Sequence, residues 1–391
     1  MKSVFAKPIY LGAATRSPIG KFGGTLKRFS APQLATLTLQ QAIRRAPDAL
    51  APDFVLLGHA RQAGGGPNSA RQCVIGAGLS EKVPAMTVNQ ACASGLASII
   101  GGAEKIALGR AHSVWAGGVE SMSNTPYYLM QARWGLRMGH TEVTDGMSKD
   151  GFMCPMAQML MGETVERFIA GEQKISRAEQ DAYALESGKR ANLSWEKGLF
   201  KDETFEIPTE GKNPGLSHDE HRRTDISIES LAKLPAVFDP KTGTLTAGNS
   251  SGITDGSAWV HLSDRRDSHA QVEIIDYETI ALDPRRMGLG PIESIQNLLR
   301  RQNLTVADIG KFEINEAFAA QVIACNRVLN IPPEKLNSRG GSIAIGHPIG
   351  CTGTRITVTL THQLKGNSGM LGVASVCVSG GLGVSLLLRS L

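Results

Sequence analysis

The chain has 391 residues, of which 41% are hydrophobic and 20% are charged. These proportions are typical of globular proteins and exclude a disordered or fibrous chain, and a size of about 150 residues per domain indicates two to three domains. The formal net charge of +5 is spread along the chain without a basic run, so the sequence predicts no nucleic-acid binding.

The sequence contains no segment that predicts membrane insertion or export. No run approaches the roughly 20 apolar residues of a membrane span, and the N-terminal residues resemble neither a signal peptide nor a transit segment. The cysteines form no closely spaced pair, which favours reduced thiols in a cytoplasmic protein. They are Cys73, Cys92, Cys154, Cys325, Cys351 and Cys377.

The first 120 residues alternate short apolar runs with helical patterns. We expect helices at 32–45 and from Cys92 to Leu108. The expected strands are 9–11, 54–57, 86–88 and 113–116, the last ending in Gly117-Gly118. This alternation predicts an α/β fold with a parallel sheet covered by helices.

The segment from 121 to 249 has a different character. It is rich in methionine near its start and polar and turn-rich near its end. One helix is predicted from Ser176, where Glu179 completes a capping box, to about Ala191. We interpret this segment as an insertion that holds a ligand against the α/β core.

The α/β pattern returns after residue 249. Cys351 opens a helix that runs to about Leu364, and the next strand ends in Ser379-Gly380-Gly381, much as Cys92 opens a helix before a strand that ends in two glycines. This echo predicts two similar halves, although chance similarity between glycine-rich turns would give the same pattern. The expected strands are 258–262, 272–276, 312–314 and 372–376, with a helix at 292–302.

Cys92 lies where a predicted strand gives way to a helix of small residues. Free backbone N–H groups and the helix dipole favour a thiolate at this position and are expected to lower the thiol pKa. The small neighbours Ala91, Ala93 and Gly95 leave room for a substrate carbonyl, whose oxyanion the same N–H groups could hold. Cys92 is thus a candidate nucleophile; the alternative is a buried structural cysteine.

Three segments of the C-terminal third add further candidates. Asn315 follows the strand at 312–314, where α/β proteins place ligand groups, although it could instead cap the next helix. His347 lies between a glycine and a proline, which fix the backbone and leave the ring accessible, as a general base requires; a turn histidine without a role is the alternative. Cys377 ends a strand before a flexible turn and alone would indicate packing only.

Together these segments resemble the thiolase family, the acyl-CoA C-acyltransferases, over nearly the whole chain. The most specific likeness is the order of Cys92, Asn315, His347 and Cys377, each in its own turn. The other matching segments are 12–24, 117–123, 246–256, 340–350 and 376–381.

The resemblance implies a five-layer αβαβα fold that is built from two similar halves with an inserted loop domain. The N-terminal half would comprise residues 1–120, with 250–270 returning to it. The loop domain, which binds CoA and substrate, would be residues 121–249, and the C-terminal half would be residues 271–391.

The resemblance also implies catalytic roles. Cys92 would attack the acyl thioester after activation by His347, and Cys377 would move the second proton that a carbon–carbon Claisen step requires. One oxyanion site would use His347 and a water held by Asn315, and the other the backbone N–H groups of Cys92 and Ser379. Ser379 stands where the family usually has glycine. Because the donor is a backbone group, we expect this oxyanion site to persist.

Coenzyme A is implied as a substrate and not as a permanently bound cofactor. Ser251 would lie along its pantetheine arm and Arg223 near its nucleotide end, and Met161, Ala317 and Phe318 would also contact the substrate. The stretch His218-Asp219-Glu220-His221 has residue types that bind metals, but no third ligand motif lies nearby, so no metal site is predicted.

The implied activity is CoA-dependent thiolytic cleavage of a 3-ketoacyl-CoA to acetyl-CoA and a shortened acyl-CoA, or the reverse condensation, through an acyl-cysteine. Short-chain biosynthetic members typically carry His-Met-Gly where this chain has Leu160-Met161-Gly162. Loss of that histidine leaves an apolar, adaptable wall, which predicts longer substrates and thiolysis, as in fatty-acid β-oxidation. A short-chain acetoacetyl-CoA thiolase is the alternative. The family also implies a homodimer or homotetramer through the N-terminal half.

The sequence argues against three other functions. A decarboxylating ketoacyl synthase has a second histidine where Asn315 stands and no counterpart of Cys377. A non-catalytic acyl-CoA-binding protein of the same fold would be free to lose Cys92 or His347, and both are present. A dinucleotide-dependent oxidoreductase is disfavoured because no GxGxxG motif follows the first predicted strand.

Overall fold

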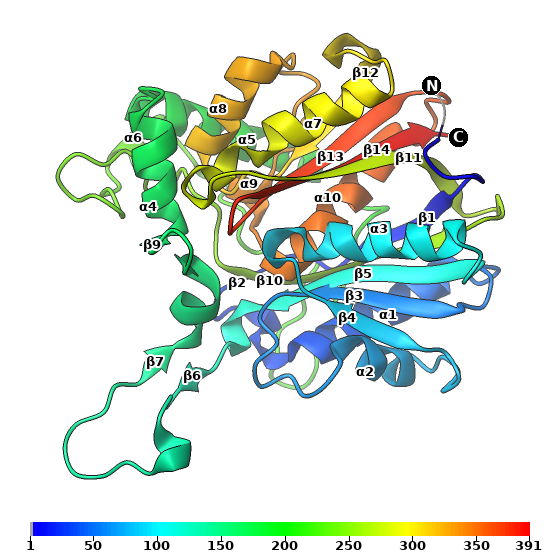
Figure 1. Cartoon of the computed structure of the whole chain (residues 1–391), viewed down its shortest axis with the longest axis horizontal. Coiled ribbons are helices and arrows are strands. Elements are labelled where there is room, and N and C mark those ends of the chain that lie inside the picture. The colour runs from blue at the N-terminus through cyan, green and yellow to red at the C-terminus, as the bar shows by residue number, and fades with distance from the viewer. Residues whose placement is uncertain (1–2) are drawn as a thin grey trace.

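The structure is a computed structural model that describes residues 3–391. Its centre is a ten-stranded mixed sheet that runs through two halves of the molecule (Figure 1). The first half contains β1 (Tyr10–Arg16), β2 (Gly20–Lys21), β3 (Phe54–His59), β4 (Ala85–Val88), β5 (Ser113–Ser121) and β10 (Thr254–Ser263), with helices α1 (Ala31–Arg45), α2 (Ser69–Gly76) and α3 (Ser94–Ala107). The second half contains β11 (Ala270–Ala281), β12 (Ile309–Ile314), β13 (Leu371–Val378) and β14 (Leu382–Ser390), with helices α7 (Gly290–Arg301), α8 (Ala319–Leu329), α9 (Ser342–Ile345) and α10 (Ile349–Leu364).

The two halves repeat one strand topology. In the first half the order is β3-β5-β10-β1, in which β3 and β5 are parallel and the other neighbours are antiparallel. In the second half the order β12-β13-β14-β11 has the same directions. The edge strand β4 also has a counterpart, because Leu336 forms an isolated parallel bridge with Phe312 of β12. The predicted pair of similar halves is confirmed, and the pairing of β1 with β11 joins the halves into one sheet.

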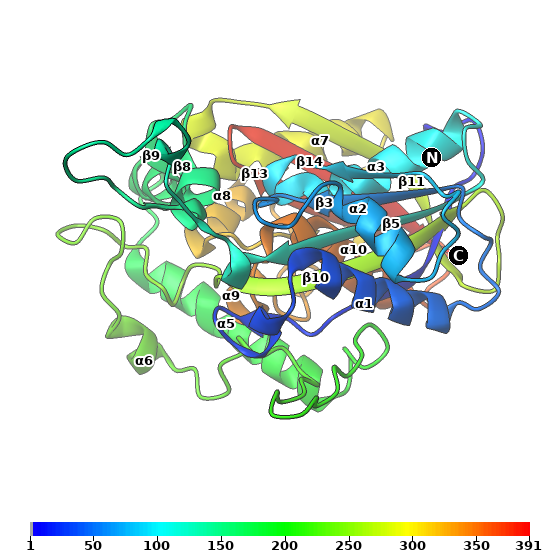
Figure 2. The same ribbon diagram turned by 90° about the horizontal axis from the view of Figure 1, so that it is seen from below.

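Helices form three layers around the two parts of the sheet (Figures 1 and 2). α1 and α2 pack on the outer face of the first part, and α7 packs on the outer face of the second beside α8. α3 and α10 lie between the two parts and pack against each other. This is the expected five-layer αβαβα fold, and its central layer consists of the two helices whose sequences echo each other.

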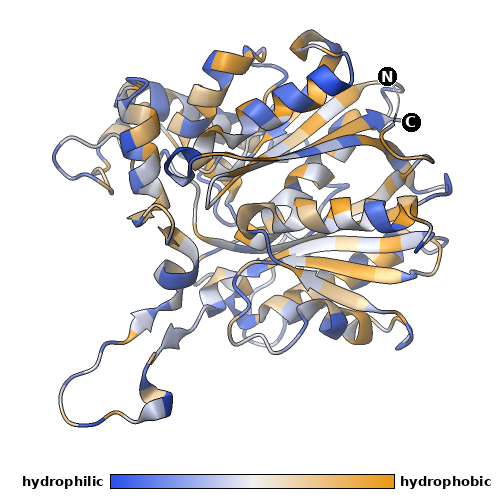
Figure 3. Cartoon of the chain, in the orientation of Figure 1, coloured by the Kyte–Doolittle hydropathy of each residue, from blue (hydrophilic) through white to orange (hydrophobic). Residues whose placement is uncertain are grey.

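The strands of the sheet are largely apolar because helices cover both faces (Figure 3). All nine residues of β5 are buried. We expected this strand to end at Gly117-Gly118, but it continues to Ser121. The two glycines permit close packing instead, since a Cβ on Gly117 would collide with the Trp259 ring and one on Gly118 with the Gly350 carbonyl oxygen. Helix α2 and strand β14 were not predicted from the sequence.

The segment between β5 and β10 is layered on this core, although the predicted domain boundaries stay a prediction. The predicted capping box is confirmed: Ser176 Oγ accepts from the Glu179 N–H at 3.2 Å, and Glu179 Oε2 accepts from the Ser176 N–H at 2.8 Å. The main elements of this segment are β6 (Tyr127–Tyr128), β7 (Thr144–Asp145), β8 (Met153–Cys154), β9 (Met159–Leu160), α4 (Met161–Val165), α5 (Arg177–Glu196) and α6 (Ile228–Ala232).

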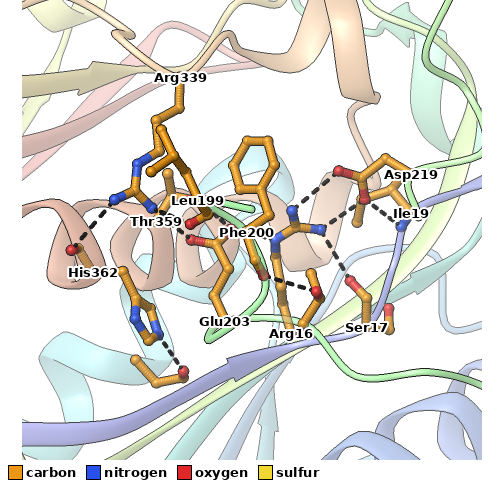
Figure 4. A network of polar contacts seen from close by, with 12 residues as sticks. Arg16, Ser17, Ile19, Leu199, Phe200, Glu203, Asp219, Arg339, Thr359 and His362 are labelled. Atoms are coloured by element: carbon orange, nitrogen blue, oxygen red, sulfur yellow. Dashed lines mark hydrogen bonds and ion pairs between the residues drawn. The ribbon is translucent and has the colours of Figure 1, made fainter. Parts of the chain in front are cut away.

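A buried ionic network fastens this segment to both halves (Figure 4). Arg16, at the end of β1, pairs with Glu203 at 2.6 Å and with Asp219 at 2.7 Å, and all three side chains are fully buried. Glu203 also accepts a hydrogen bond from Thr359 of α10 at 3.0 Å. Trp195 at the end of α5 donates its indole N–H to Asp219 at 3.0 Å. One guanidinium thus links the sheet, the central layer and the inserted segment.

A long arm, defined here as Tyr127–Asp145, projects from the body between β6 and β7 (Figure 1). Its tip carries large apolar side chains in the open: Trp134 is 86% exposed and Met138 is fully exposed. Nothing within residues 3–391 covers these side chains. Within residues 3–391, no helix combines the length and apolar character that crossing a membrane requires.

Candidate active site

Cys92 lies in a strained turn between β4 and α3. It is the middle residue of a short 3-10 helix, Ala91–Ala93, and Ala91 itself has the left-handed conformation with φ of 45°. This conformation costs a non-glycine residue about 1–3 kcal/mol and persists only where neighbours fix it. Here the Ala91 N–H donates to Asn89 Oδ1 at 2.9 Å, and Ser94 Oγ donates to the Ala91 carbonyl at 2.7 Å. The turn therefore fixes the direction of the Cys92 side chain.

The N-terminal ends of α3 and α10 meet at two glycines. A Cβ on Gly95 would lie 2.5 Å from the Thr354 backbone nitrogen, and one on Gly353 would lie 2.4 Å from the Leu96 backbone nitrogen. Only glycine permits this approach. Because Cys92 precedes α3 and His347 precedes α10, the contact brings the turns that carry these two residues together.

Three of the four predicted catalytic side chains line one cavity of about 660 Å³: Cys92, His347 and Cys377. They are only 6%, 7% and 1% exposed, respectively, so the cavity is their route to a substrate. Asn315 is 1% exposed and is not among the residues that line the cavity, although Ala317 and Phe318 of the same loop are. The structure thus brings Cys92, His347 and Cys377 to one cavity, whereas Asn315 does not line it.

We expected the thiol pKa of Cys92 to lie below its ordinary value, and this expectation is wrong for the resting protein. Burial raises the pKa of Cys92 and outweighs the groups that favour thiolate, namely the backbone N–H groups of Ser379 and Cys92 and the Arg61 guanidinium. Cys92 therefore rests as a thiol and needs a base before it can act as a nucleophile. The two N–H groups named for an oxyanion site are both directed at its sulfur.

His347 is oriented as a proton acceptor. Its Nδ1 lies 2.6 Å from Thr352 Oγ1, and that hydroxyl donates to the Pro348 carbonyl at 3.0 Å. Because the only hydroxyl hydrogen is used there, the imidazole carries its proton on Nδ1 and donates it, which leaves Nε2 as the acceptor. Burial and the charges of Arg355 and Arg61 lower the pKa of His347 to about 3, so the ring is neutral.

The last residues of β13 and the turn that follows place Cys377 and Ser379 beside Cys92. Burial raises the pKa of Cys377 well above its ordinary value, and the nearby Cys92 adds to this effect, so Cys377 is a neutral thiol that can donate a proton. Gly380 and Gly381 have φ of 88° and 84°, which favours glycine, whereas Ser379 has no positive φ. A serine therefore fits where the family usually has glycine.

Asn315 does not cap the helix that follows it, because Phe318 is the N-cap of α8. Its Oδ1 accepts from Ser342 Oγ at 2.6 Å, and Ser342 Oγ accepts from Arg355 Nη2 at 2.6 Å. Its Nδ2 is buried and has no partner within residues 3–391. A buried donor of this kind is normally satisfied, so the amide is available to hold a water or a ligand.

The five residues expected at the substrate all line the same cavity: Met161, Arg223, Ser251, Ala317 and Phe318. Among the further lining residues is Phe238, which was not predicted at the site from the sequence. Phe238 packs against Phe318 with 6.1 Å between ring centroids. The available signal was the apolar pair Val237-Phe238 within an otherwise polar stretch.

The stretch His218–His221 serves other contacts. Asp219 belongs to the buried network of Arg16, and Glu220 accepts from the Thr25 N–H and hydroxyl. Burial lowers the pKa of His221 to about 4, with a contribution from Arg223. In the described part of the chain, no group of three or more His, Cys, Asp or Glu residues is placed to hold a metal ion.

The chain matches the models of a known protein family over both of its halves. The thiolase N-terminal domain model matches residues 9–266, and the thiolase C-terminal domain model matches residues 268–390. The chain is 40% identical over 388 residues to an acetyl-CoA acetyltransferase of Escherichia coli (strain K12). The alignment covers 97% of this chain and 98% of that protein.

Solved structures give the same result. The acetyl-CoA acetyltransferase of Bacillus anthracis has a TM-score of 0.93 and 39% identity, with 99% of this chain and 100% of that chain covered. Human mitochondrial 3-ketoacyl-CoA thiolase in complex with CoA has a TM-score of 0.93 and 35% identity, with 98% of each chain covered. The chain therefore belongs to the thiolase family of acyltransferases.

Proposed function

We propose that this enzyme cleaves 3-ketoacyl-CoAs with CoA, and catalyses the reverse condensation, through an acyl group on Cys92. The observation that supports this most directly is the convergence of Cys92, His347 and Cys377 on one cavity. The backbone N–H groups of Cys92 and Ser379, which are directed at the sulfur, add an oxyanion site to this group.

In the first half-reaction, His347 Nε2 takes the thiol proton and Cys92 Sγ attacks the 3-keto carbon. The backbone N–H groups of Cys92 and Ser379 hold the resulting oxyanion. When the C2–C3 bond breaks, its electron pair passes to C2, and Cys377 gives its proton to that carbon, releasing acetyl-CoA. The imidazolium of His347 and a water on Asn315 hold the enolate oxygen of the departing thioester.

In the second half-reaction, the CoA thiol gives its proton to the Cys377 thiolate and attacks the acyl carbon on Cys92. The Cys92 sulfur leaves and takes back a proton from His347. Both thiols and the neutral imidazole are restored, and the products are acetyl-CoA and an acyl-CoA that is two carbons shorter.

The direct test is to mix the enzyme with a 3-ketoacyl-CoA in the absence of free CoA and to analyse its peptides by mass spectrometry. We expect acetyl-CoA release and one acyl group on the peptide that contains Cys92. Addition of CoA should remove the acyl group as a shortened acyl-CoA. A protein that binds the ligand but carries no acyl group would instead be a non-catalytic binding protein of the same fold.

The neutral state of His347 predicts an unusual pH profile. Because the pKa of His347 is lowered to about 3, the ring still accepts a proton as the pH falls through the ordinary histidine value of about 6.5. We expect kcat/KM for thiolysis to stay within about twofold between roughly pH 8 and pH 5, measured with constant ionic strength. A proportional fall that begins near pH 6.5 would show that the free enzyme needs a base of ordinary pKa.

The wall of the cavity supports the proposal of longer substrates. Leu160, Met161, Phe238 and Met287 line it, and each buried methylene contributes about 0.8 kcal/mol. The six additional methylenes of 3-ketodecanoyl-CoA would contribute up to about 5 kcal/mol, so we expect its kcat/KM to exceed that of acetoacetyl-CoA by on the order of 10³-fold. A preference for the four-carbon substrate would instead identify a short-chain acetoacetyl-CoA thiolase.

The exposed arm supports a homo-oligomer. Its apolar tip has no cover within residues 3–391, and a surface of this kind usually contacts another subunit. We expect the double variant Trp134→Ser, Met138→Ser to have a lower mass in light scattering than the parent at the same concentration. The matched control is Leu108→Ser, which removes an apolar side chain that is 76% exposed at the end of α3. Equal masses for all three proteins would show that the arm does not contribute to the subunit interface.

The role in β-oxidation and the cytoplasmic location stay predictions from the sequence.

A further inference from the structure

A second cavity, of about 460 Å³, adjoins the active-site cavity. Met161 lines both cavities, so the two meet at this residue. Ser379, whose N–H is directed at the Cys92 sulfur, lines the second cavity as well. An acyl chain held on Cys92 therefore has this cavity within its reach. Its polar lining includes Arg61, Asn89, Lys149 and Asp150.

The Arg61 guanidinium in this lining is buried and incompletely bonded. Arg61 is 6% exposed, and its Nε and Nη1 have no hydrogen-bond partner within residues 3–391. Nη2 has one long contact, 3.4 Å, to the Met147 carbonyl, and the guanidinium stacks on the Phe152 ring at 4.9 Å. The described chain gives it no ion pair, which is costly for a buried cation.

The nearby carboxylates are already engaged. Glu120 is fully buried and accepts from the backbone N–H groups of Arg61 and Gly350. Asp150, on the rim of the second cavity, accepts from the Tyr128 hydroxyl at 2.6 Å. Both carry negative charge toward Arg61, but neither bonds its free N–H groups. Nε and Nη1 of Arg61 thus have no acceptor among the described residues.

We propose that Arg61 binds a carboxylate at the far end of the acyl chain, so that the enzyme prefers 3-ketoacyl-CoAs derived from dicarboxylic acids. This inference rests on the proposed thiolase function. A carboxylate is the planar anion that a guanidinium bonds best, and it would supply the partner that the protein omits. The apolar part of the chain would contact Met161, while the charged end would lie in the polar cavity.

The test compares substrates that differ only at this end. Because the chain length is not fixed in advance, it uses two matched pairs: the mono-CoA thioester of 3-oxohexanedioic acid against 3-oxohexanoyl-CoA, and that of 3-oxooctanedioic acid against 3-oxooctanoyl-CoA. A hydrogen-bonded charge contributes about 1.5–3 kcal/mol. We therefore expect the parent enzyme to favour the carboxylate member of at least one pair by roughly 10- to 100-fold in kcat/KM.

The variants Arg61→Gln and Arg61→Lys separate recognition from other effects. Gln should abolish the preference, measured as the ratio of kcat/KM within each pair, and Lys should retain part of it. Any effect of the Arg61 charge on Cys92 is common to both members of a pair and cancels in their ratio. Absence of a preference in the parent, or equal loss of both substrates in Arg61→Gln, would overturn the inference. If neutral substrates are cleaved in that case, the proposed thiolase function stands; if no substrate acylates Cys92, the thiolase function itself fails.

Discussion

Replacement of Cys92 by alanine should lower kcat for thiolysis by on the order of 10⁴-fold or more, because no other group would form the covalent acyl intermediate. Cys377 is not a substitute. Burial holds its pKa well above the ordinary value, and the role that we propose for it is the other proton transfer. The change should leave ligand binding nearly intact, since the cavity wall and the two backbone N–H groups remain. Steady-state thiolysis and the tightness of acyl-CoA binding, measured side by side, check both expectations.

Cys73→Ala is the matched control for loss of a buried thiol. Cys73 is fully buried in α2 and packs in the outer core of the first half, away from the reactive cavity. Burial raises its thiol pKa to about 12, and it does not line the cavity that holds His347, so we assign it no nucleophilic role. We expect this variant to keep its acylation by substrate. Retained turnover in Cys92→Ala, or loss of acylation in Cys73→Ala, would contradict the assignment of the nucleophile.

Replacement of Arg16 by alanine should destabilise the protein by about 3–5 kcal/mol. The change leaves Glu203 and Asp219 buried without their cation (Figure 4). Because these carboxylates join the inserted segment to the core, we expect that segment to loosen first. Urea unfolding followed by tryptophan fluorescence is suitable, since Trp195 donates to Asp219 within the network. The midpoint should move to lower urea concentration.

An exposed ion pair supplies the contrast for this experiment. Arg285 pairs with Asp283 at 2.6 Å, with the two side chains 54% and 37% exposed. Exposed pairs of this kind contribute at most about 1 kcal/mol, so Arg285→Ala should hardly change the midpoint. Similar shifts of the urea midpoint in the two variants would show that the Arg16 network contributes no more to stability than an exposed ion pair.

Much of the fold could be predicted because local patterns and packing agree. In the helix at 32–45 and the strand at 54–57, the apolar residues recur at the positions that the fold buries. Both elements occur nearly as expected. The echo between the Cys92 and Cys351 segments predicted a repeat, and the central pair α3 and α10 is that repeat. The grouping of Cys92, His347 and Cys377 followed from resemblance, because residues so distant in sequence have no local signal of proximity.

The remaining features depend on contacts that one segment of sequence does not contain. The length of β5 depends on its pairing with β10, which lies far along the chain and extends β5 to Ser121. The raised thiol pKa of Cys92 results from burial, whereas the local sequence shows only the helix start that favours thiolate. Arg61 and Phe238 were not predicted at the site, because an isolated arginine or phenylalanine has many other uses. Their importance becomes visible only when the surrounding donors and cavities are known.

The helix ends that touch at Gly95 and Gly353 leave less space than one methyl group requires. A rotation of one half relative to the other would therefore break this contact. It would also separate the Cys92 thiol from the His347 imidazole. We therefore expect the segments around Met161 and Phe238 to move when a ligand enters or leaves, while the frame, meaning the sheet with α3 and α10, keeps its conformation. Stabilising the frame further should thus cost little turnover, whereas stiffening those segments should slow product departure.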